Sequence, residues 1–137
     1  MKPESLSGAL DRTQAREFAG PWLEAWTGNR PDLLASFYSP DAFYRDPGVP
    51  EGLNGLKQIT AYFTRLLAAN PDWVWRHVDA TPMEGGFLNH WSAIIPTAAG
   101  LIECRGVCTV RLERGLITRN EVFFDRTPLL PGSTPRE

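Results

Sequence analysis

Asp46, Pro47 and Gly48 form the part of this sequence best suited to chemistry. Residues 42–45 predict a brief strand, which would place the Asp46 carboxylate at the strand's end, facing the space between helices and a sheet. In an apolar pocket such a carboxylate can act as a general base, because burial raises its proton affinity while it stays ionised. Asp-Pro-Gly is also a common turn, in which the carboxylate accepts a hydrogen bond from a nearby amide. Both interpretations stay open at this point.

Aromatic side chains are the second feature with chemical potential. The chain has five tryptophans in 137 residues, and most of them are expected to pack in the core or at a dimer interface. A cavity walled by aromatic rings would also hold a flat or cyclic apolar molecule, with a few polar groups to orient it.

Alternation with period two sorts the polar candidates on the predicted strands. Asn89 and Trp91 share one face of residues 87–97, which turns His90 to the outer face. On the last strand Asn120, Val122 and Phe124 share one face, while Arg119, Glu121, Phe123 and Asp125 share the other. Asn120 and Asp125 cannot both face inward unless a bulge intervenes. The sequence leaves open which of them does.

Three helices are expected in the first half of the chain, from the helical spacing of apolar residues. The first carries Ala15, Phe18, Ala19, Trp22, Leu23 and Trp26, and Gly28 with Asn29 ends it. Pro21 predicts a kink or a restart inside it. The second covers residues 32–38, with Leu33, Leu34 and Phe37 facing inward. The third carries Leu56, Ile59, Phe63, Leu66 and Leu67 and ends near Asn70. A loose loop is expected over residues 47–55.

Four long strands are expected in the second half, joined by turns that suit antiparallel hairpins. They cover residues 73–81, 87–97, 101–113 and 116–125. Helices followed by a meander indicate an α+β fold of two layers. On the third strand Cys104, Cys108 and Val110 share the inner face. The outer face mixes aliphatic and charged residues, which suggests partial cover by a second subunit; a solvated face is the alternative.

Composition and charge exclude several classes of protein. A net charge of −2 gives no electrostatic footprint for nucleic acid or an anionic membrane. Without an 18-residue apolar run or a signal peptide, we expect a cytoplasmic protein. Cys104 and Cys108 would stand about 13 Å apart on one strand, so we expect free buried thiols. No metal or organic cofactor is implied. We expect frayed ends in the first dozen residues and after Leu130.

The segment FYSPDAFYRDPGVPEGLNGLKQITAYF, residues 37–63, together with the later strands resembles the nuclear transport factor 2-like superfamily. That superfamily includes ketosteroid isomerase, SnoaL-like polyketide cyclases and limonene-epoxide hydrolase. The resemblance implies a single domain in residues 1–137, ordered over about 13–127. It implies a cone-shaped roll, with three N-terminal helices against a curved, mainly antiparallel sheet. In ketosteroid isomerase an Asp followed by Pro at this strand end is the general base, and Asp46-Pro47 matches it.

The oxyanion donors of that enzyme do not carry over. Trp22 falls at the position of its Tyr, and Cys108 falls near its protonated Asp. An indole N–H and a thiol are weaker donors, and losing one oxyanion donor costs about 10²–10³ in rate. Ketosteroid isomerisation is therefore not expected. SnoaL-like cyclases use an acid nearest Cys108, so their chemistry lacks the same group.

Limonene-epoxide hydrolase gives a second partial match. GLITRNEVFFDRTPL resembles its last strand, which places Asp125 on a catalytic Asp, and Tyr44 with Asp46 matches its Tyr-x-Asn. Its Arg-x-Asp has no counterpart in residues 88–97. Asp46 and Asp125 are therefore the predicted catalytic pair, dividing acid and base roles. The alternative for Asp125 is an ion pair with Arg119 or Arg126.

We therefore expect a SnoaL-like protein that binds a small apolar molecule, cyclic or carbonyl-bearing, with isomerase- or cyclase-type chemistry at Asp46. The predicted binding residues are Trp22, Trp26, Tyr44, Asn89, Trp91, Cys108, Asn120 and Phe124. A homodimer through the outer sheet face is the expected assembly. Two alternatives remain: a non-catalytic ligand-binding or dimerisation module, and an epoxide hydrolase-like enzyme.

Overall fold

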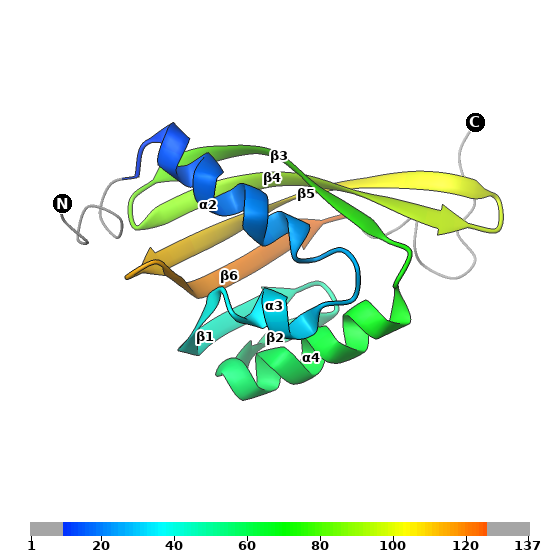
Figure 1. Ribbon diagram of the computed structural model, residues 1–137, viewed down its shortest axis with the longest axis horizontal. Helices are drawn as coiled ribbons and strands as arrows, with labels where there is room; N and C mark the ends of the chain where they lie inside the picture. Colours follow the sequence, from blue (N-terminus) through cyan, green and yellow to red (C-terminus); the bar gives the residue numbers. More distant parts are fainter. Residues whose placement is uncertain (1–9, 126–137) are drawn as a thin grey trace.

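A computed structural model describes residues 10–125 and arranges three helices against one six-stranded sheet (Figure 1). The helices are α2 (Arg12–Glu24), α3 (Pro31–Ala35) and α4 (Leu56–Ala69). The strands are β1 (Tyr38–Asp46), β2 (Val49–Asn54), β3 (Val74–Met83), β4 (Gly86–Thr97), β5 (Gly100–Glu113) and β6 (Leu116–Phe124). Their order is β2-β1-β6-β5-β4-β3, and only the β1–β6 pairing is parallel. The predicted α+β fold with a mainly antiparallel sheet is confirmed.

Helix α2 begins earlier than its sequence suggested, at Arg12, and also ends earlier, at Glu24. Asp11 and Gln14 form a capping box, in which the Asp11 carboxylate accepts from the Gln14 N–H and the Gln14 side chain accepts from the Asp11 N–H. Pro21 lies inside the helix, which continues to Glu24 without a restart. Of the predicted kink or restart, the restart does not occur, because the buried stripe on both sides of Pro21 packs on one sheet and outweighs the lost hydrogen bond. Gly28 and Asn29, predicted to end the helix, have positive φ but belong to the turn that follows its last residue, Glu24.

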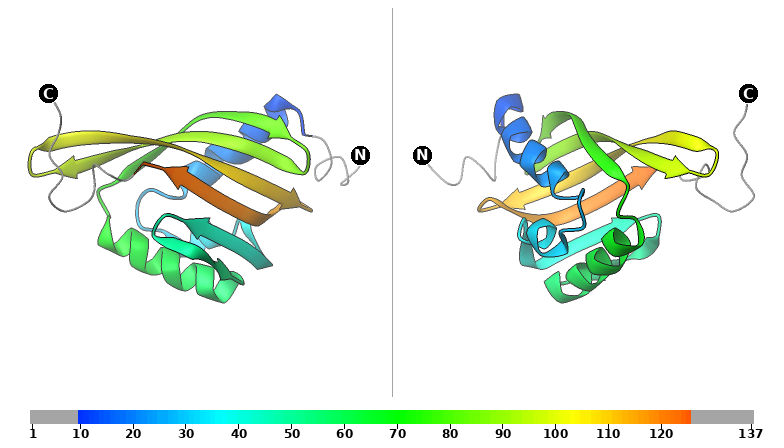
Figure 2. Two further views of the ribbon diagram at one scale, coloured as in Figure 1. Left: turned by 180° about the vertical axis from the view of Figure 1, so that it is seen from behind. Right: turned by 45° about the vertical axis from the view of Figure 1, so that its right-hand side comes forward.

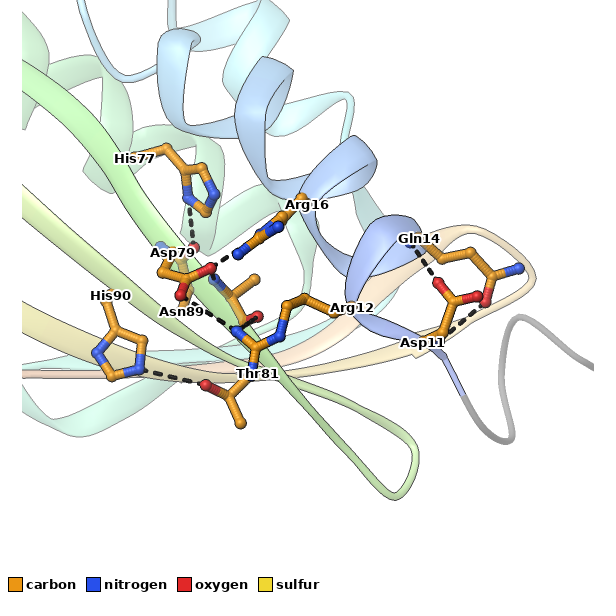
Figure 3. A network of polar contacts seen from close by, with 10 residues as sticks. Asp11, Arg12, Gln14, Arg16, His77, Asp79, Thr81, Asn89 and His90 are labelled. Atoms are coloured by element: carbon orange, nitrogen blue, oxygen red, sulfur yellow. Dashed lines mark hydrogen bonds and ion pairs between the residues drawn. The ribbon is translucent and has the colours of Figure 1, made fainter.

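Two ion pairs attach α2 to β3 (Figure 3). Arg12 Nη1 lies 3.1 Å from Asp79 Oδ2, and Arg16 Nε lies 2.9 Å from Asp79 Oδ1. On its buried side Trp22 packs edge-to-face on Phe87 of β4, with ring centroids 6.2 Å apart. The helix is therefore fixed across the β3–β4 end of the sheet by an apolar inner face and a charged outer edge.

Helix α3 is shorter than predicted, and β1 is longer. The helix ends at Ala35, and Tyr38 already belongs to β1. Leu33 is 43% exposed, so its predicted inward position was wrong; a helix of this length buries only Leu34 and Ala35. Strand β1 takes nine residues because it is paired on both sides, by β2 and by β6.

The loose loop expected over residues 47–55 was wrong, because Val49–Asn54 form strand β2. Tyr44 pairs with Leu53 and Asp46 pairs with Val49, with a bulge between the two pairs. The strand lies at the edge of the sheet, where Pro50 costs no ladder hydrogen bond. Helix α4 then follows as predicted, with Ile59, Phe63 and Leu67 buried, and runs along the β1–β2 edge (Figure 2).

The predicted faces of the long strands are confirmed. Cys104, Cys108 and Val110 are buried on the inner face of β5, and both cysteines are free. The outer face of the sheet leaves Leu101 and Phe123 at 73% and 47% exposure. The β4–β5 hairpin projects beyond the other strands (Figures 1 and 2).

None of the helices within residues 10–125 combines the length and the apolar character that crossing a membrane requires. Most of the ends predicted to fray, residues 1–9 and those after Leu130, lie outside the described residues. So do Arg126, the predicted partner of Asp125, and residue 127 of the expected ordered core.

Candidate ligand pocket around Asp46

The inner face of the sheet and the helices enclose a cavity of about 240 Å³. Helices α2 and α4 and every strand except β2 contribute to its wall, which is largely aromatic. Trp22 and Trp26 come from α2 and the turn after it, Tyr62 from α4, and Trp75 and Trp91 from β3 and β4. The volume equals about eight water molecules at ~30 Å³ each, which suits a ligand of one or two rings.

Asp46 brings the only charged side chain among the described residues that line this cavity. The residue is 8% exposed, and four neighbouring groups donate hydrogen bonds to its carboxylate. The Tyr44 hydroxyl donates to Oδ2 at 2.7 Å, and the Tyr62 hydroxyl donates to both oxygens, at 2.9 and 3.1 Å. The Gly48 and Val49 N–H groups donate to Oδ1 at 2.7 and 3.2 Å.

The turn after β1 gives Asp46 its two amide donors. Pro47 has no N–H, so the first amides available to the carboxylate are those of Gly48 and Val49. A side chain at position 48 would bring its Cβ to 3.0 Å from the Tyr62 hydroxyl and 3.1 Å from Asp46 Oδ1. Glycine thus keeps the phenol and the carboxylate in contact. Asp46 therefore caps a turn, as one interpretation of the sequence had it, and also borders the cavity; its role as a general base stays a prediction.

Two buried tyrosines extend the polar group behind the carboxylate. Burial, with the adjacent Asp46 charge, raises the pKa of Tyr44 well above its ordinary value. Burial likewise raises the pKa of Tyr38, which accepts a hydrogen bond from Asn120 Nδ2 at 3.0 Å. Both phenols therefore stay protonated at neutral pH and do not act as bases, and Tyr44 is a fixed donor to Asp46.

Two polar atoms in the cavity wall have no hydrogen-bond partner. They are the Trp22 Nε1 donor and the Asn120 Oδ1 acceptor, both in fully buried residues. The Trp22 N–H lies near the Tyr38 hydroxyl as a weak donor and opposes the rise that burial causes in the pKa of Tyr38, although the contact falls short of full hydrogen-bonding geometry. Buried polar groups normally find partners, so these two atoms are unsatisfied groups in residues that line the cavity. Both atoms are covered, so a ligand can bond to them only after a side chain moves.

The structure brings eight of the ten predicted site residues to one cavity. The lining residues among them are Asp46, Trp22, Trp26, Tyr44, Trp91, Cys108, Asn120 and Phe124. Burial raises the pKa of the Cys108 thiol to about 12, so this residue contributes an uncharged wall.

Asn89 and Asp125 do not border the cavity. Asn89 faces inward as predicted, but its side-chain amide contacts neighbouring side chains and not the cavity. Its Oδ1 lies 2.9 Å from His77 Nδ1, and its Nδ2 donates to Cys108 Sγ at 3.9 Å. Asp125 is exposed just beyond β6. The alternation along that strand turns Asn120 inward and Asp125 outward, which answers the question that the sequence left open. Asp46 and Asp125 therefore do not form a catalytic pair in one pocket.

Sequence reasoning missed Tyr62, the nearest side chain to Asp46 outside its own strand. Its helical spacing placed it beside the apolar stripe of α4, and nothing in the sequence linked that stripe to Asp46. The pairing of Asp46 with Val49 makes the link, because it folds the β1–β2 hairpin onto α4. Trp73 and Trp75 also line the cavity, and neither was among the predicted binding residues.

No group of three or more His, Cys, Asp or Glu side chains within residues 10–125 is placed to hold a metal ion. The cavity has a different character: one carboxylate, two unpartnered neutral polar atoms and an aromatic wall. That set can orient a small organic molecule and exchange a proton with it.

The fold and this pocket define a class of protein that the family comparison identifies. A family profile described as the SnoaL-like domain matches residues 20–120. The chain therefore belongs to the SnoaL-like domain family. A comparison with functionally curated proteins found no match.

Solved structures of similar fold support this assignment. One is a SnoaL-like polyketide cyclase, so named provisionally, from Jannaschia sp. CCS1, with a TM-score of 0.71 and 14% identity over 86% of this chain and 90% of that one. Another, from Catenulispora acidiphila, has a ketosteroid isomerase-like fold and was solved with trimethylamine; the TM-score is 0.68 and the identity 20%, over 81% and 87% of the chains. A third, TerC co-crystallised with polyporic acid, has a TM-score of 0.69 and 13% identity over 82% and 92%. At these identities the likeness concerns the fold.

Proposed function

We propose that this protein binds a small, mostly apolar molecule of one or two rings and uses Asp46 to remove a proton next to a carbonyl group. The observation that carries the proposal is the placement of a nearly buried carboxylate and an unpartnered indole N–H in the wall of one aromatic cavity. Isomerase- and cyclase-type reactions both begin with such a step. That structurally similar proteins were crystallised with small molecules supports binding in the cavity.

The proposed step needs only groups of this chain and its substrate. The Asp46 carboxylate takes a proton from the carbon next to the carbonyl, and the electron pair of that C–H bond becomes part of an enolate. The Trp22 N–H, which is covered in the unliganded protein, donates a hydrogen bond to the enolate oxygen after a shift of its ring. Asp46 then returns the proton to the same carbon or to another one. Because Tyr62 donates to both oxygens of Asp46 and is the less buried phenol, it is the donor that has to yield.

Hydrogen exchange tests this step without knowledge of the natural substrate. Cyclohexanone and 1-tetralone are incubated with the protein in D₂O, and the loss of the α-hydrogen signals is followed by ¹H NMR. We expect exchange above the buffer rate that saturates with ketone. Asp46→Asn should lower the catalysed rate by about 10² or more while the ketone still binds, since general base catalysis contributes 10²–10⁴.

Asp125→Asn is the matched control, because it removes a carboxylate that lies outside the cavity. It should leave both binding and exchange unchanged. If it abolished exchange as fully as Asp46→Asn, the epoxide hydrolase-like alternative with two acids would return.

A non-catalytic ligand-binding module is the second candidate function. The observation that favours it is that the acceptor positions of Asp46 are already occupied by two phenols and two amides. Ketone binding, seen as quenching of the cavity tryptophans, without any catalysed exchange would establish this alternative.

A homodimer through the outer face of the sheet belongs to the proposal. Exposed Phe123 and Leu101 on that face, on β6 and β5, are the observation that supports it. Sedimentation should give twice the monomer mass, and Phe123→Glu should shift it to the monomer. The predicted cytoplasmic location stays a prediction.

A further inference from the structure

The charge of the pocket is uncompensated. Each hydrogen bond to the Asp46 carboxylate comes from a neutral donor, either a phenol or a backbone amide. No lysine, arginine or histidine stands among the described residues that line the cavity. A negative charge that is nearly buried and faced only by dipoles attracts a positive one more strongly than an exposed charge does.

Two other carboxylates of the described chain are each paired with two arginines. Asp79 contacts Arg12 and Arg16. Glu121, whose side chain is 17% exposed on the outer face, contacts Arg45 at 2.7 Å and Arg119 at 3.2 Å. The fold thus supplies guanidinium groups to these two acids and none to the carboxylate inside the cavity.

Aromatic rings extend from Asp46 along the cavity wall. Tyr44 packs 5.8 Å from Tyr62 and 6.2 Å from Trp26, measured between ring centroids. Trp26 lies 5.7 Å from Trp75, which lies 5.5 Å from Trp73. The negative faces of such rings stabilise an organic cation at close range, and tryptophan does so best.

The ligand chemistry follows from these two features together. We propose that the pocket takes an organic monocation, with a tertiary or quaternary ammonium group beside Asp46 and the aromatic rings. This rests on the proposed function in one respect, namely that the cavity binds a small molecule. A primary ammonium needs three hydrogen-bond acceptors, but the Asp46 oxygens already accept from four groups. An ammonium with one N–H or none uses the charge without requiring those positions.

Three probes of similar shape test the charge preference on the unaltered protein. They are benzyltrimethylammonium, its neutral carbon isostere neopentylbenzene, and the anion phenylacetate. Titration is followed by the fluorescence of the cavity tryptophans and repeated by calorimetry. We expect the cation to bind about tenfold or more tightly than the neutral isostere, with phenylacetate weakest. Equal or tighter binding of neopentylbenzene would overturn the proposal.

Two variants locate the effect. Asp46→Asn should bring the affinities of the cation and the neutral isostere to within about twofold of each other. Glu121→Gln, which removes a carboxylate from the outer face, should keep the full preference. Should Asp46→Asn fail to fold, Trp75→Leu replaces it and is expected to narrow the preference at least about threefold through the lost ring. A preference unchanged in the variants would contradict the assignment to this pocket.

The outcomes separate this inference from the proposed function. If neutral ketones bind and exchange but the cation binds no more tightly than its neutral isostere, the proposed function holds. The inference of an organic cation is then rejected. If neither the ketones nor any of the three probes binds, both proposals fail together.

Discussion

Asp46 and Asp79 place the same carboxylate in two opposite settings. Asp79 lies at the surface where α2 crosses β3, with 37% of its side chain exposed and two arginines around it. Asp46 lies in the cavity wall at the other side of the fold, 8% exposed, and is bonded only by neutral donors. One carboxylate is paired with arginines where it holds a helix, and the other has no cationic partner where a ligand can reach it.

Local hydrogen-bond and ion-pair partners, more than burial alone, decide what each of these two carboxylates can do. The two arginines and the Ala80 N–H donate hydrogen bonds to the Asp79 carboxylate and balance its charge. Asp79 is therefore suited to holding the helix and not to binding a ligand. The phenols and amides orient Asp46 without cancelling its charge. Exposed ion pairs contribute little to stability, whereas buried hydrogen-bonded groups are costly to disrupt.

Removing the two carboxylates should give the largest difference between the regions. Asp46→Ala leaves the buried Tyr44 hydroxyl and the Gly48 N–H without an acceptor, and we expect the free energy of unfolding to fall by about 2–4 kcal/mol. Asp79→Ala should cause a clearly smaller loss. Urea unfolding followed by fluorescence measures both. Equal losses would mean that the surface ion pairs hold the fold as firmly as the buried group.

The two phenols at Asp46 sharpen the comparison within the pocket. Tyr44→Phe removes a fully buried hydroxyl and should lower the free energy of unfolding by about 1–2 kcal/mol, whereas Tyr62→Phe should cost about 0.5–1 kcal/mol. Tyr62→Phe also frees an acceptor position on Asp46, so the catalysed exchange of ketones should rise. Urea unfolding and the NMR assay provide the two readings. A fall in exchange would assign Tyr62 a role in positioning the substrate.

The pH dependence of stability tests the contribution of the Asp79 ion pairs. The hydrogen bond from Arg16, followed by that from the Ala80 N–H, holds the pKa of Asp79 at about 2. The unfolded value is about 3.9, so folding favours the ionised form. The stabilising contribution is therefore complete above about pH 4 and is lost as the pH falls toward 2.

The stability difference between the wild type and Asp79→Asn should follow this curve. Urea unfolding at several pH values from 6 to 2 measures it, with Arg65→Gln, an exposed arginine on α4, as a control for general charge effects. A difference that stayed constant down to pH 2 would show that the ion pairs do not stabilise the fold.

The smallest expected effect concerns the two cysteines of the pocket wall, which should not react with an alkylating reagent. Burial raises the pKa of Cys108 to about 12, and burial with the nearby Asp125 charge raises that of Cys104. Since the thiolate is the reactive form, iodoacetamide at pH 8 should leave both thiols unmodified in the native protein and alkylate both in urea. Mass spectrometry gives the count. Rapid native labelling of Cys108 would show that the pocket is wetter than its aromatic wall implies.

The long strands and the helical stripes were predictable because their burial follows simple periods. Alternation along β6 alone was enough to set Asn120 and Asp125 on opposite faces, although the sequence could not say which face was inner. Asp46 could be singled out because a strand end, a proline and a glycine surround it. Capping by a nearby amide was one of its two interpretations, but the two phenols could not be predicted, since Tyr62 lies on α4, 16 residues later.

The parts that escaped prediction depend on contacts distant in the chain. Strand β2 contains Pro50 and Gly52 and shows no alternation, and it becomes a strand because β1 offers it an edge. Pro21 is tolerated inside α2 because the sheet holds both halves of the stripe. Tyr62 became a site residue only through the β1–β2 hairpin. Local propensity carries no information about such partners.

The parallel pairing of β1 with β6 has a consequence for the order of folding. Tyr44 pairs with Asn120, 76 residues later in the chain, so the wall that carries Asp46 closes only against the last strand. During synthesis the helices and the β1–β2 hairpin can form early, but the pocket is completed once residue 124 is available. Contacts of this range form slowly, because a long loop must close first. Ligand binding in a refolding experiment should therefore appear after most of the helical signal.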